Sequence, residues 1–478
     1  MRVLVVSNMY PRDHNPIGGI FVHEQVKALR AKGVDARVVS GGPHWLPARQ
    51  PLNAARQVRW HIRHNRSPQW TQYEGVPVVY FPYFAGGFCR VDFYPRLYRW
   101  SLLRWIDEIR RDFPFDLVHA HTAFLDGFAG IGVAERFGVP LILTEHTGPF
   151  TLLTRTLAMR LQTEQAINAA DHVLAVSSAL RRDILANVRV NRPERITVIP
   201  NGVDVGAFST AFDPMETLHK PGWPGDYMGR DDLADLLRRV RGLAFAENDD
   251  PAERMETLRQ ALLGTVKQDV VEGPEGRDEG LIQALWVGHF VDVKRIDRLV
   301  HGFAIAHRRN PRLRLTLLGA SATGGGVEHE VREQIRKEGV GDAIRILPGT
   351  GREGVRHHMS NCDFLVISSE TETFGVVAIE ALSLGKPVLS TRCGGPEDII
   401  ASPDLGVLVD RDGESIAIGF AEMAKRLPSF DAEKIRNHAI ANYSFETISD
   451  RLIELYDRFL GTDHRSIGAP SELACEAE

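Results

Sequence analysis

The stretch 368–382 constrains the fold of this chain more than any other part of the sequence. A short apolar run, 363–367, precedes it and is typical of a strand buried on both faces of a sheet. The stretch then turns through 373–375 and begins a helix, which Gly385 ends before the second short apolar run at 388–391. This order of strand, loop, helix and strand predicts a parallel α/β sheet. Such sheets bind ligands at the carboxyl ends of their strands, where helix N-termini also stabilise phosphate.

Two glutamates lie at this predicted ligand-binding end, Glu372 in the loop and Glu380 in the helix. Eight residues of helix span roughly 12 Å, whereas the carboxyl groups of a retaining glycosidase stand about 5 Å apart. Carboxylates held this far apart can instead accept hydrogen bonds from hydroxyls at opposite ends of an elongated ligand, such as the hexose and ribose of a sugar nucleotide. In the alternative interpretation, Glu372 only caps the helix and Glu380 is a solvated helix residue.

Composition restricts the classes of protein to consider. The chain has 478 residues, of which 43% are hydrophobic and 25% are charged, as expected for a soluble protein with two α/β domains. A net charge of −5 gives no reason to expect nucleic-acid binding. The four cysteines are scattered without metal-ligand spacing and are interpreted as reduced cytosolic thiols. No signal peptide and no long apolar run is visible, so we expect a chain that spans no membrane.

Several motifs resemble a known family. Glu372-Thr-Phe-Gly with Glu380-Ala-Leu, followed by Gly385-Lys-Pro-Val and Gly394-Gly-Pro-Glu-Asp-Ile, resembles the signature of the retaining glycosyltransferases of family 4, which have the two-domain GT-B fold. The remaining family-like segments occur in the family's order, at 1–11, 18–29, 116–121, 143–146, 176–177, 198–204 and 286–297. The segment 18–29 looks most like bacterial cell-surface polysaccharide transferases. The resemblance covers most of 1–208 and 281–460.

The alternation of strand and helix patterns, together with this resemblance, predicts two doubly wound Rossmann-like domains that face an interdomain cleft. The predicted parts are an N-terminal acceptor-side domain at 1–208, an acidic helical insertion at 209–280, a C-terminal nucleotide-sugar-binding domain at 281–446, a helix at 447–460 that crosses back to the first domain, and a disordered tail at 461–478. The insertion departs from the family pattern. It is interpreted either as a solvated decoration or as a lid or partner site.

The resemblance implies a donor site in the second domain. Lys294 is expected to contact the diphosphate, Glu372 the hexose and Glu380 the ribose, while backbone N–H groups in the glycine loops assist. The full set of expected donor-binding residues is Gly18, Gly19, Gly288, His289, Lys294, Gly349, Glu372, Thr373, Phe374, Gly375 and Glu380. His289 stands where the family usually has an arginine, and this substitution weakens the expected diphosphate clamp. Arg295 could compensate for it.

The resemblance also implies residues for the transfer step. His146 is expected near the transferred sugar and acceptor, and the residues expected to be catalytic are His146, Glu372 and Lys294. Weaker candidates at strand ends are His121, Ser177 and Asn201, while His119 is expected to pack within its strand. We expect no metal and no cofactor, because no Asp-X-Asp element is convincing and GT-B relatives work without one. Retention of anomeric configuration is implied by the family alone.

Aromatic residues and arginines interleave at 80–105, and further arginines occur at 49–66 with Trp45 and Trp60. Such a stretch on the acceptor-facing domain could dock at the anionic inner face of the plasma membrane and would suit a glycan or lipid-linked acceptor in surface polysaccharide or glycolipid biosynthesis. In the opposing interpretation the aromatic residues are core and the arginines are a solvated face.

Two alternatives to a transferase stay open. A GT-B sugar-nucleotide epimerase would act on the donor alone, whereas a phosphorylase would need a pyridoxal-phosphate lysine motif that is not visible. A non-catalytic sugar-nucleotide-binding subunit is suggested by His289 and by the insertion. An enzyme is favoured over a binding subunit by the joint presence of Glu372, Glu380, Lys294 and His146. We expect this enzyme in the cytoplasm.

Overall fold

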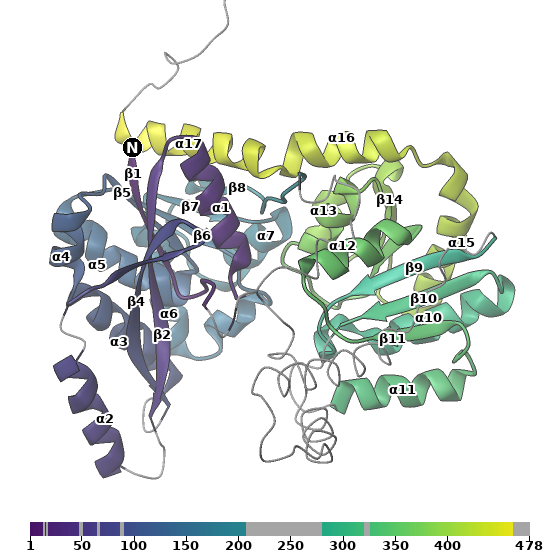
Figure 1. The fold of residues 1–478 in the computed structure, drawn as a ribbon, viewed down its shortest axis with the longest axis horizontal. Coiled ribbons are helices and arrows are strands. Elements are labelled where there is room, and N and C mark those ends of the chain that lie inside the picture. The colour runs from purple at the N-terminus through teal and green to yellow at the C-terminus, as the bar shows by residue number, and fades with distance from the viewer. Residues whose placement is uncertain are drawn as a thin grey trace, which may run out of the picture.

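The computed structural model describes residues 1–12, 15, 18–46, 51–64, 67–86, 90–206, 280–319 and 326–461. These residues form two α/β domains, each built on its own sheet (Figure 1). The two doubly wound domains predicted from the sequence are therefore confirmed. The predicted insertion and the predicted tail lie outside the described ranges, apart from Gly280 and Gly461.

The first domain contains an eight-stranded sheet with the order β3-β4-β2-β1-β5-β6-β7-β8, in which β3 alone pairs antiparallel. Its strands are β1 Arg2–Ser7, β2 Asp35–Leu46, β3 Trp70–Tyr73, β4 Val76–Gly86, β5 Leu117–His121, β6 Leu141–Glu145, β7 His172–Ala175 and β8 Ile196–Val198. Its α-helices are α1 Ile20–Ala31, α2 Pro51–His64, α3 Tyr94–Leu103, α4 Ile106–Asp112, α5 Phe128–Phe137, α6 Leu157–Ala169 and α7 Ser178–Asn187. Shorter turns are η1 Val91–Phe93, the π-helix η2 Ala123–Gly127, η3 Phe150–Thr154 and η4 Pro193–Arg195.

The second domain contains a six-stranded parallel sheet with the order β11-β10-β9-β12-β13-β14. Its strands are β9 Ile282–Val287, β10 Leu313–Leu318, β11 Ile344–Leu347, β12 Phe364–Ile367, β13 Val388–Thr391 and β14 Gly406–Val409. Its helices are α10 Ile296–Arg309, α11 Gly326–Glu338, α12 Arg352–Asn361, α13 Val376–Ser383, α14 Gly395–Ile399, α15 Gly413–Arg426, α16 Ala432–Tyr443 and α17 Phe445–Leu460, with short turns η7 Asp292–Lys294, η8 Pro403–Leu405 and η9 Leu427–Ser429.

The strands of the first sheet change from apolar to polar residues at their carboxyl ends. In the buried interior the register sets Val6 beside Val39 and Ala120, an apolar row. One residue further along, Ser40 pairs with Tyr80, and His121 pairs with both Ser7 and Thr144. These paired residues form a polar row at the carboxyl edge of the first sheet, which is the edge where ligand-binding side chains are expected.

The last helix returns to the first domain. Figure 1 shows α16 and α17 running across both domains along one side of the molecule. The apolar stripe of α17 is buried in one cluster with side chains of β1, β2 and α1; this stripe consists of Ile448, Leu452, Leu455 and Tyr456. The burial of this stripe, with its helical spacing, holds the C-terminal end of the described chain on the N-terminal domain.

Candidate functional site

The loop between β12 and α13 is shaped by glycines that permit close backbone approach. Gly375 has φ +97°, in the left-handed region that favours glycine, and begins α13 without a side-chain cap. A Cβ at Gly395 would lie 2.3 Å from the backbone of Phe374. The Glu372 N–H donates to the Cys393 carbonyl over 2.7 Å, which fixes the loop against the start of α14. The uncapped N-terminus of α13 can therefore receive an anion.

Lys294 and Glu372, both predicted in the donor site, meet directly. The Lys294 Nζ donates to Glu372 Oε2 over 2.5 Å, and the Ser369 hydroxyl donates to the same oxygen over 3.3 Å. A further hydrogen bond joins the two loops, since the Ser368 hydroxyl donates to the Lys294 carbonyl over 2.8 Å. A phosphate group at Lys294 and a sugar hydroxyl at Glu372 would thus lie next to each other.

The residues flanking Lys294 differ in their surroundings. His289 is exposed, and Gly288 lies where a Cβ would approach the Trp286 ring to 3.2 Å. Arg295 forms an ion pair with Asp297 over 2.6 Å, and its guanidinium group is therefore already engaged on its own side of the turn.

Glu380 lies on α13, as predicted, and it is half-buried. Burial raises the pKa of Glu380 to about 7, and the nearby Arg352 charge opposes this rise. Arg352 begins α12 just after Gly349, which lies in an exposed loop, and it also contacts Glu24 of the first domain over 3.2 Å. Arg352 thus lies between Glu380 of the second domain and α1 of the first. Sequence reasoning missed it because its significance depends on that packing.

His146 lies beside His121 on the first domain. The His146 Nε2 and the His121 Nδ1 are 3.0 Å apart, and the rings stack with an interplanar angle of 10°. One of these nitrogens must carry the proton in the bond between them. Burial, with the nearby His119, lowers the pKa of His146 to about 3. The imidazole is therefore neutral near neutral pH, and its Nδ1 is buried without a hydrogen-bond partner among the described residues.

A carboxylate that the motif contained, but to which no role was assigned, positions the His146 loop. The fully buried Glu145 accepts the backbone N–H groups of His146 and Thr147 over 2.9 and 2.7 Å, and that of Ala123 over 2.7 Å. The ring of Phe21, in the first turn of α1, packs 4.7 Å from the His146 ring. The residue before α1, Gly19, has φ +71°, and a Cβ there would lie 2.1 Å from the Met9 carbonyl oxygen.

The donor loop and the His146 loop touch each other across the two domains. A Cβ at Gly148 would lie only 1.7 Å from Thr373 Oγ1. The Ser177 hydroxyl donates to the Thr373 carbonyl over 2.7 Å and also caps α7 by accepting from the Leu180 N–H. The Ser177 hydroxyl therefore both caps α7 and contacts the second domain. The predicted donor-side and acceptor-side residues are therefore brought together in one region.

Three candidates have other surroundings. His119 is fully buried and bonds the hydroxyls of Tyr456 and Thr144 over 2.6 and 2.7 Å, so its predicted packing role is confirmed. Asn201 lies half-buried in the segment after β8. Gly18 stands at the start of α1, where its N–H donates to Asn15.

The aromatic stretch divides between core and surface. Phe81, Tyr83, Tyr98 and Trp105 are buried in the core of the first domain. The exposed aromatic side chains in and before it are Trp45, Trp60, Phe93 and Trp100. The core interpretation is therefore confirmed for the buried residues, while membrane docking of the exposed ones stays a prediction.

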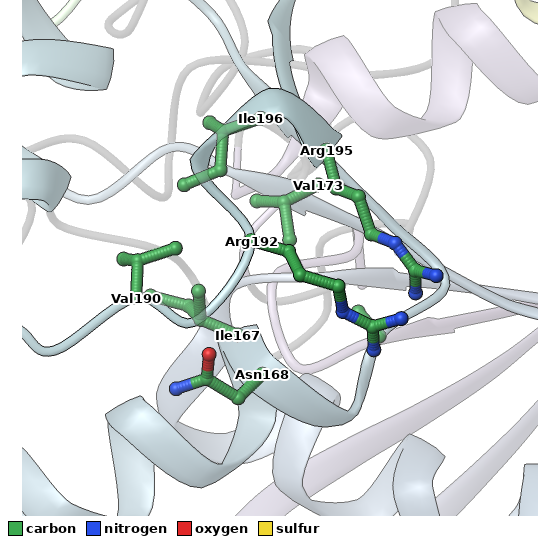
Figure 2. Close-up of a pocket in the computed structure, with 8 residues that line it drawn as sticks. Ile167, Asn168, Val173, Val190, Arg192, Arg195 and Ile196 are labelled. Atoms are coloured by element: carbon green, nitrogen blue, oxygen red, sulfur yellow. The ribbon is translucent and has the colours of Figure 1, made fainter.

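A small pocket lies elsewhere in the first domain (Figure 2). It is lined by the N-terminal residues of β7 and β8 and by the end of α6, including Val173, Ile196 and Asn168. Asn168 already donates to two backbone carbonyls and accepts from the Asn191 N–H. Because this is the amino end of the strands, the pocket lies away from the carboxyl-end site.

Within the described ranges, no group of His, Cys, Asp or Glu side chains could hold a metal ion. Across the same part of the chain, every helix is too short or too polar to span a bilayer.

Comparisons with known proteins match both domains to glycosyltransferases. Residues 18–206 match the family model described as Glycosyltransferase Family 4, and residues 268–426 match Glycosyl transferases group 1. The D-inositol 3-phosphate glycosyltransferase of Nocardiopsis dassonvillei is 29% identical over 309 residues, covering 62% of this chain and 58% of the relative. That of Frankia alni is 27% identical over 307 residues, covering 62% of each. The chain thus spans about three-fifths of the length of these curated relatives.

The fold also matches solved structures. The chain resembles Anabaena HepE in complex with UDP, with a TM-score of 0.61 and 17% identity over 96% of this chain and all of that one. It resembles the sucrose-phosphate synthase of Thermosynechococcus elongatus with a TM-score of 0.63 and 15% identity over the same shares.

Proposed function

The chain belongs to the glycosyltransferase family whose two domain models it matches in order, and it has the GT-B fold. On this premise we propose that it is a retaining, metal-independent hexosyltransferase. It moves a hexose from a nucleotide-diphosphate sugar to a glycan or lipid-linked acceptor and requires no cofactor. The observation that carries the proposal is the 2.5 Å contact between Lys294 and Glu372 at the uncapped N-terminus of α13, against the loop that bears His146.

Each residue has a definite task in this reaction. The Lys294 ammonium and the α13 N-terminus stabilise the charge that grows on the departing diphosphate. Glu372 accepts hydrogen bonds from the hexose, and Glu380 accepts them from the ribose. His146 offers a neutral imidazole whose Nδ1 has no protein partner in the described chain. It is suited to a hydrogen bond with the sugar or the acceptor.

The low pKa of His146, about 3, makes the imidazole a weak base. The acceptor hydroxyl proton therefore passes to the leaving phosphate oxygen. In this step the bond from the anomeric carbon to the phosphate oxygen breaks and the bond to the acceptor oxygen forms on the same face. The products are the glycosylated acceptor and the nucleoside diphosphate. This route retains configuration without a protein nucleophile.

The acceptor side is proposed to work at a membrane, in surface polysaccharide or glycolipid biosynthesis, with the enzyme in the cytoplasm at the inner face of the plasma membrane. The support is the set of exposed aromatic side chains, of which Trp100 and Phe93 carry Arg104 and Arg96 over their rings at 5.1 and 5.7 Å. Exposed aromatic and cationic groups together favour anionic lipid surfaces. Vesicle flotation with phosphatidylglycerol checks this. Equal binding of wild type and Trp100→Ser/Phe93→Ser would count against it.

The donor assignment is tested by thermal unfolding of the purified protein with a panel of nucleoside diphosphates and their sugars, with and without magnesium. A ligand at about 100 times its Kd adds about 2.7 kcal/mol of stability. We expect one nucleotide class to stabilise the protein, magnesium to leave the shift unchanged, and Lys294→Ala to reduce it. No shift with any nucleotide, or a shift that needs magnesium, would contradict the proposal.

A further inference from the structure

Arg12 lies on the polar row of the first sheet, after the end of β1. Its Nη2 donates to the carbonyl and hydroxyl oxygens of Ser40 over 3.3 and 3.4 Å, and its guanidinium stacks over the Tyr80 ring at 4.5 Å. A glycine of β2 leaves the necessary room, since a Cβ at Gly42 would lie 2.8 Å from Arg12 Nη2. The chain thus builds a fixed seat for this side chain.

The charge of Arg12 is not compensated within the described chain. None of the ion pairs between described residues includes it, and neither its Nε nor its Nη1 donates a hydrogen bond to another described residue. The residue is half-buried, and burial lowers its pKa. A cation that is partly removed from water without a counter-ion is costly, so the site is prepared for an anion.

Tyr83 is a second unpaired donor beside it. Its side chain is 5% exposed, and its hydroxyl makes no hydrogen bond within the described chain. Burial raises the pKa of Tyr83 to about 12, and the Arg12 charge opposes the rise, as the proximity of the two groups requires.

Asp126, which also raises the pKa of Tyr83, does not neutralise Arg12. Asp126 is fully buried, and it accepts the Asn8 N–H over 2.7 Å and the Thr122 hydroxyl over 3.0 Å. Burial raises the pKa of Asp126 well above its ordinary value, and no ion pair joins its carboxyl group to Arg12 within the described chain. Arg12 remains the uncompensated charge of this cluster.

We infer that Arg12 and Tyr83 bind an anionic group of the acceptor, a phosphate or a carboxylate, at a point remote from the hydroxyl that receives the sugar. The inference rests on the proposed function, in which His146 marks the point of transfer. Arg12 sits over β2 and His146 follows β6, three strand spacings away in the order β2-β1-β5-β6. Those spacings amount to roughly 14 Å. The acceptor is therefore longer than one sugar ring and carries its charge at the far end.

The test compares Lys294→Ala with Arg12→Met/Lys294→Ala, because removing Lys294 weakens phosphate binding at the donor site. Thermal unfolding is followed in inorganic phosphate and in sodium chloride of equal ionic strength. We expect Lys294→Ala to retain a phosphate-specific shift. The double variant should need at least about tenfold more phosphate for the same shift, because it loses one charge-assisted hydrogen bond to the phosphate. Arg12→Lys should keep part of the shift, and Arg136→Met, which loses an exposed pair with Asp107, should keep all of it. Equal phosphate responses in Lys294→Ala and the double variant, or none in Lys294→Ala, would overturn the site.

Two probes separate the sources of the anion. Lactose 1-phosphate represents a soluble phosphorylated glycan, and vesicles of phosphatidylglycerol in phosphatidylcholine represent a lipid headgroup. Binding of either that is lost in Arg12→Met supports the site and assigns its source. Binding of neither, or binding that Arg12→Met leaves unchanged, refutes it. The nucleotide-induced shift of the single variant Arg12→Met should equal that of wild type. If no protein, wild type included, shows a nucleotide-induced shift, the donor assignment is rejected and the anion site at Arg12 is not.

Discussion

At the scale of single residues, the proposed donor site contains a cation and a carboxylate that form an ion pair. The sequence predicted that Lys294 and Glu372 would both serve the donor, since each lies in a motif that resembles the family. It did not predict their mutual 2.5 Å contact, because 78 positions separate them and the contact depends on the adjacency of β9 and β12. Each partner is thereby held in place for the ligand group that it is proposed to bind.

Replacing Lys294 by alanine should weaken nucleotide-sugar binding by about 1–3 kcal/mol, because one charge-assisted hydrogen bond to the diphosphate is lost. Titration calorimetry with the stabilising nucleotide measures this. Arg295→Ala is the matched control, and we expect a smaller loss because Arg295 is paired with Asp297. If Arg295→Ala had the larger effect, the diphosphate contact would belong to Arg295.

Glu380 should make stability depend on pH. Its pKa in the folded protein, about 7, lies above the ordinary 4.5, so the folded state holds the proton more tightly than the unfolded state. The resulting stability is fully present below pH 4.5 and is lost as pH rises through 7. Urea unfolding across this range should show wild type losing stability relative to Glu380→Gln, which cannot titrate. Parallel profiles would show that the carboxyl group is not buried as described.

At the scale of elements, the sequence predicted the buried parallel strands closely and the sheet edges poorly. The run 364–367 is apolar throughout and forms β12, whose residues are all buried. β3 was not predicted because Thr71 and Gln72 are exposed, so the strand lacks a clear apolar alternation. β4, Val76–Gly86, runs into the stretch 80–105, whose aromatic residues and arginines were interpreted as a docking surface or as core and not as a strand.

Tyr456 should couple α17 to the first sheet. Tyr456→Phe leaves the fully buried His119 Nδ1 without its 2.6 Å partner, which should cost about 1–3 kcal/mol of unfolding free energy. Urea unfolding at constant pH measures the loss. Arg458→Ala on the exposed side of the same helix should change stability by less than about 0.5 kcal/mol. Similar losses in both variants would mean that helix propensity, and not the hydrogen bond, is being measured.

At the scale of the whole molecule, the two domains meet through the site itself. Gly148 of the first domain abuts Thr373 of the second, and one apolar cluster contains buried side chains of both domains. The sequence predicted the two domains and the residues on each, but not which loops would touch. Relative domain placement depends on the sum of many surfaces, and no local pattern encodes it.

Gly148→Ala should push the two loops apart, because the new Cβ would lie 1.7 Å from Thr373 Oγ1. We expect a lower kcat/KM for transfer with nucleotide binding largely kept, and small-angle scattering should show a larger radius of gyration. Gly341→Ala is the control, since a Cβ there meets nothing within 4 Å. Adding Thr373→Ala should restore compactness in the Gly148→Ala protein. If it does not, the contact is not what sets the domain placement.

The return of α17 also affects the order in which the molecule can be completed during its synthesis. The apolar cluster on one face of the first sheet includes Val3 and Val5 near the start of the chain, and Leu452 and Tyr456 near its end. A ribosome makes the whole second domain before it makes the helix that covers this face. The nascent first domain therefore presents an uncovered apolar surface throughout that interval, and it becomes a finished unit only after α17 has been made.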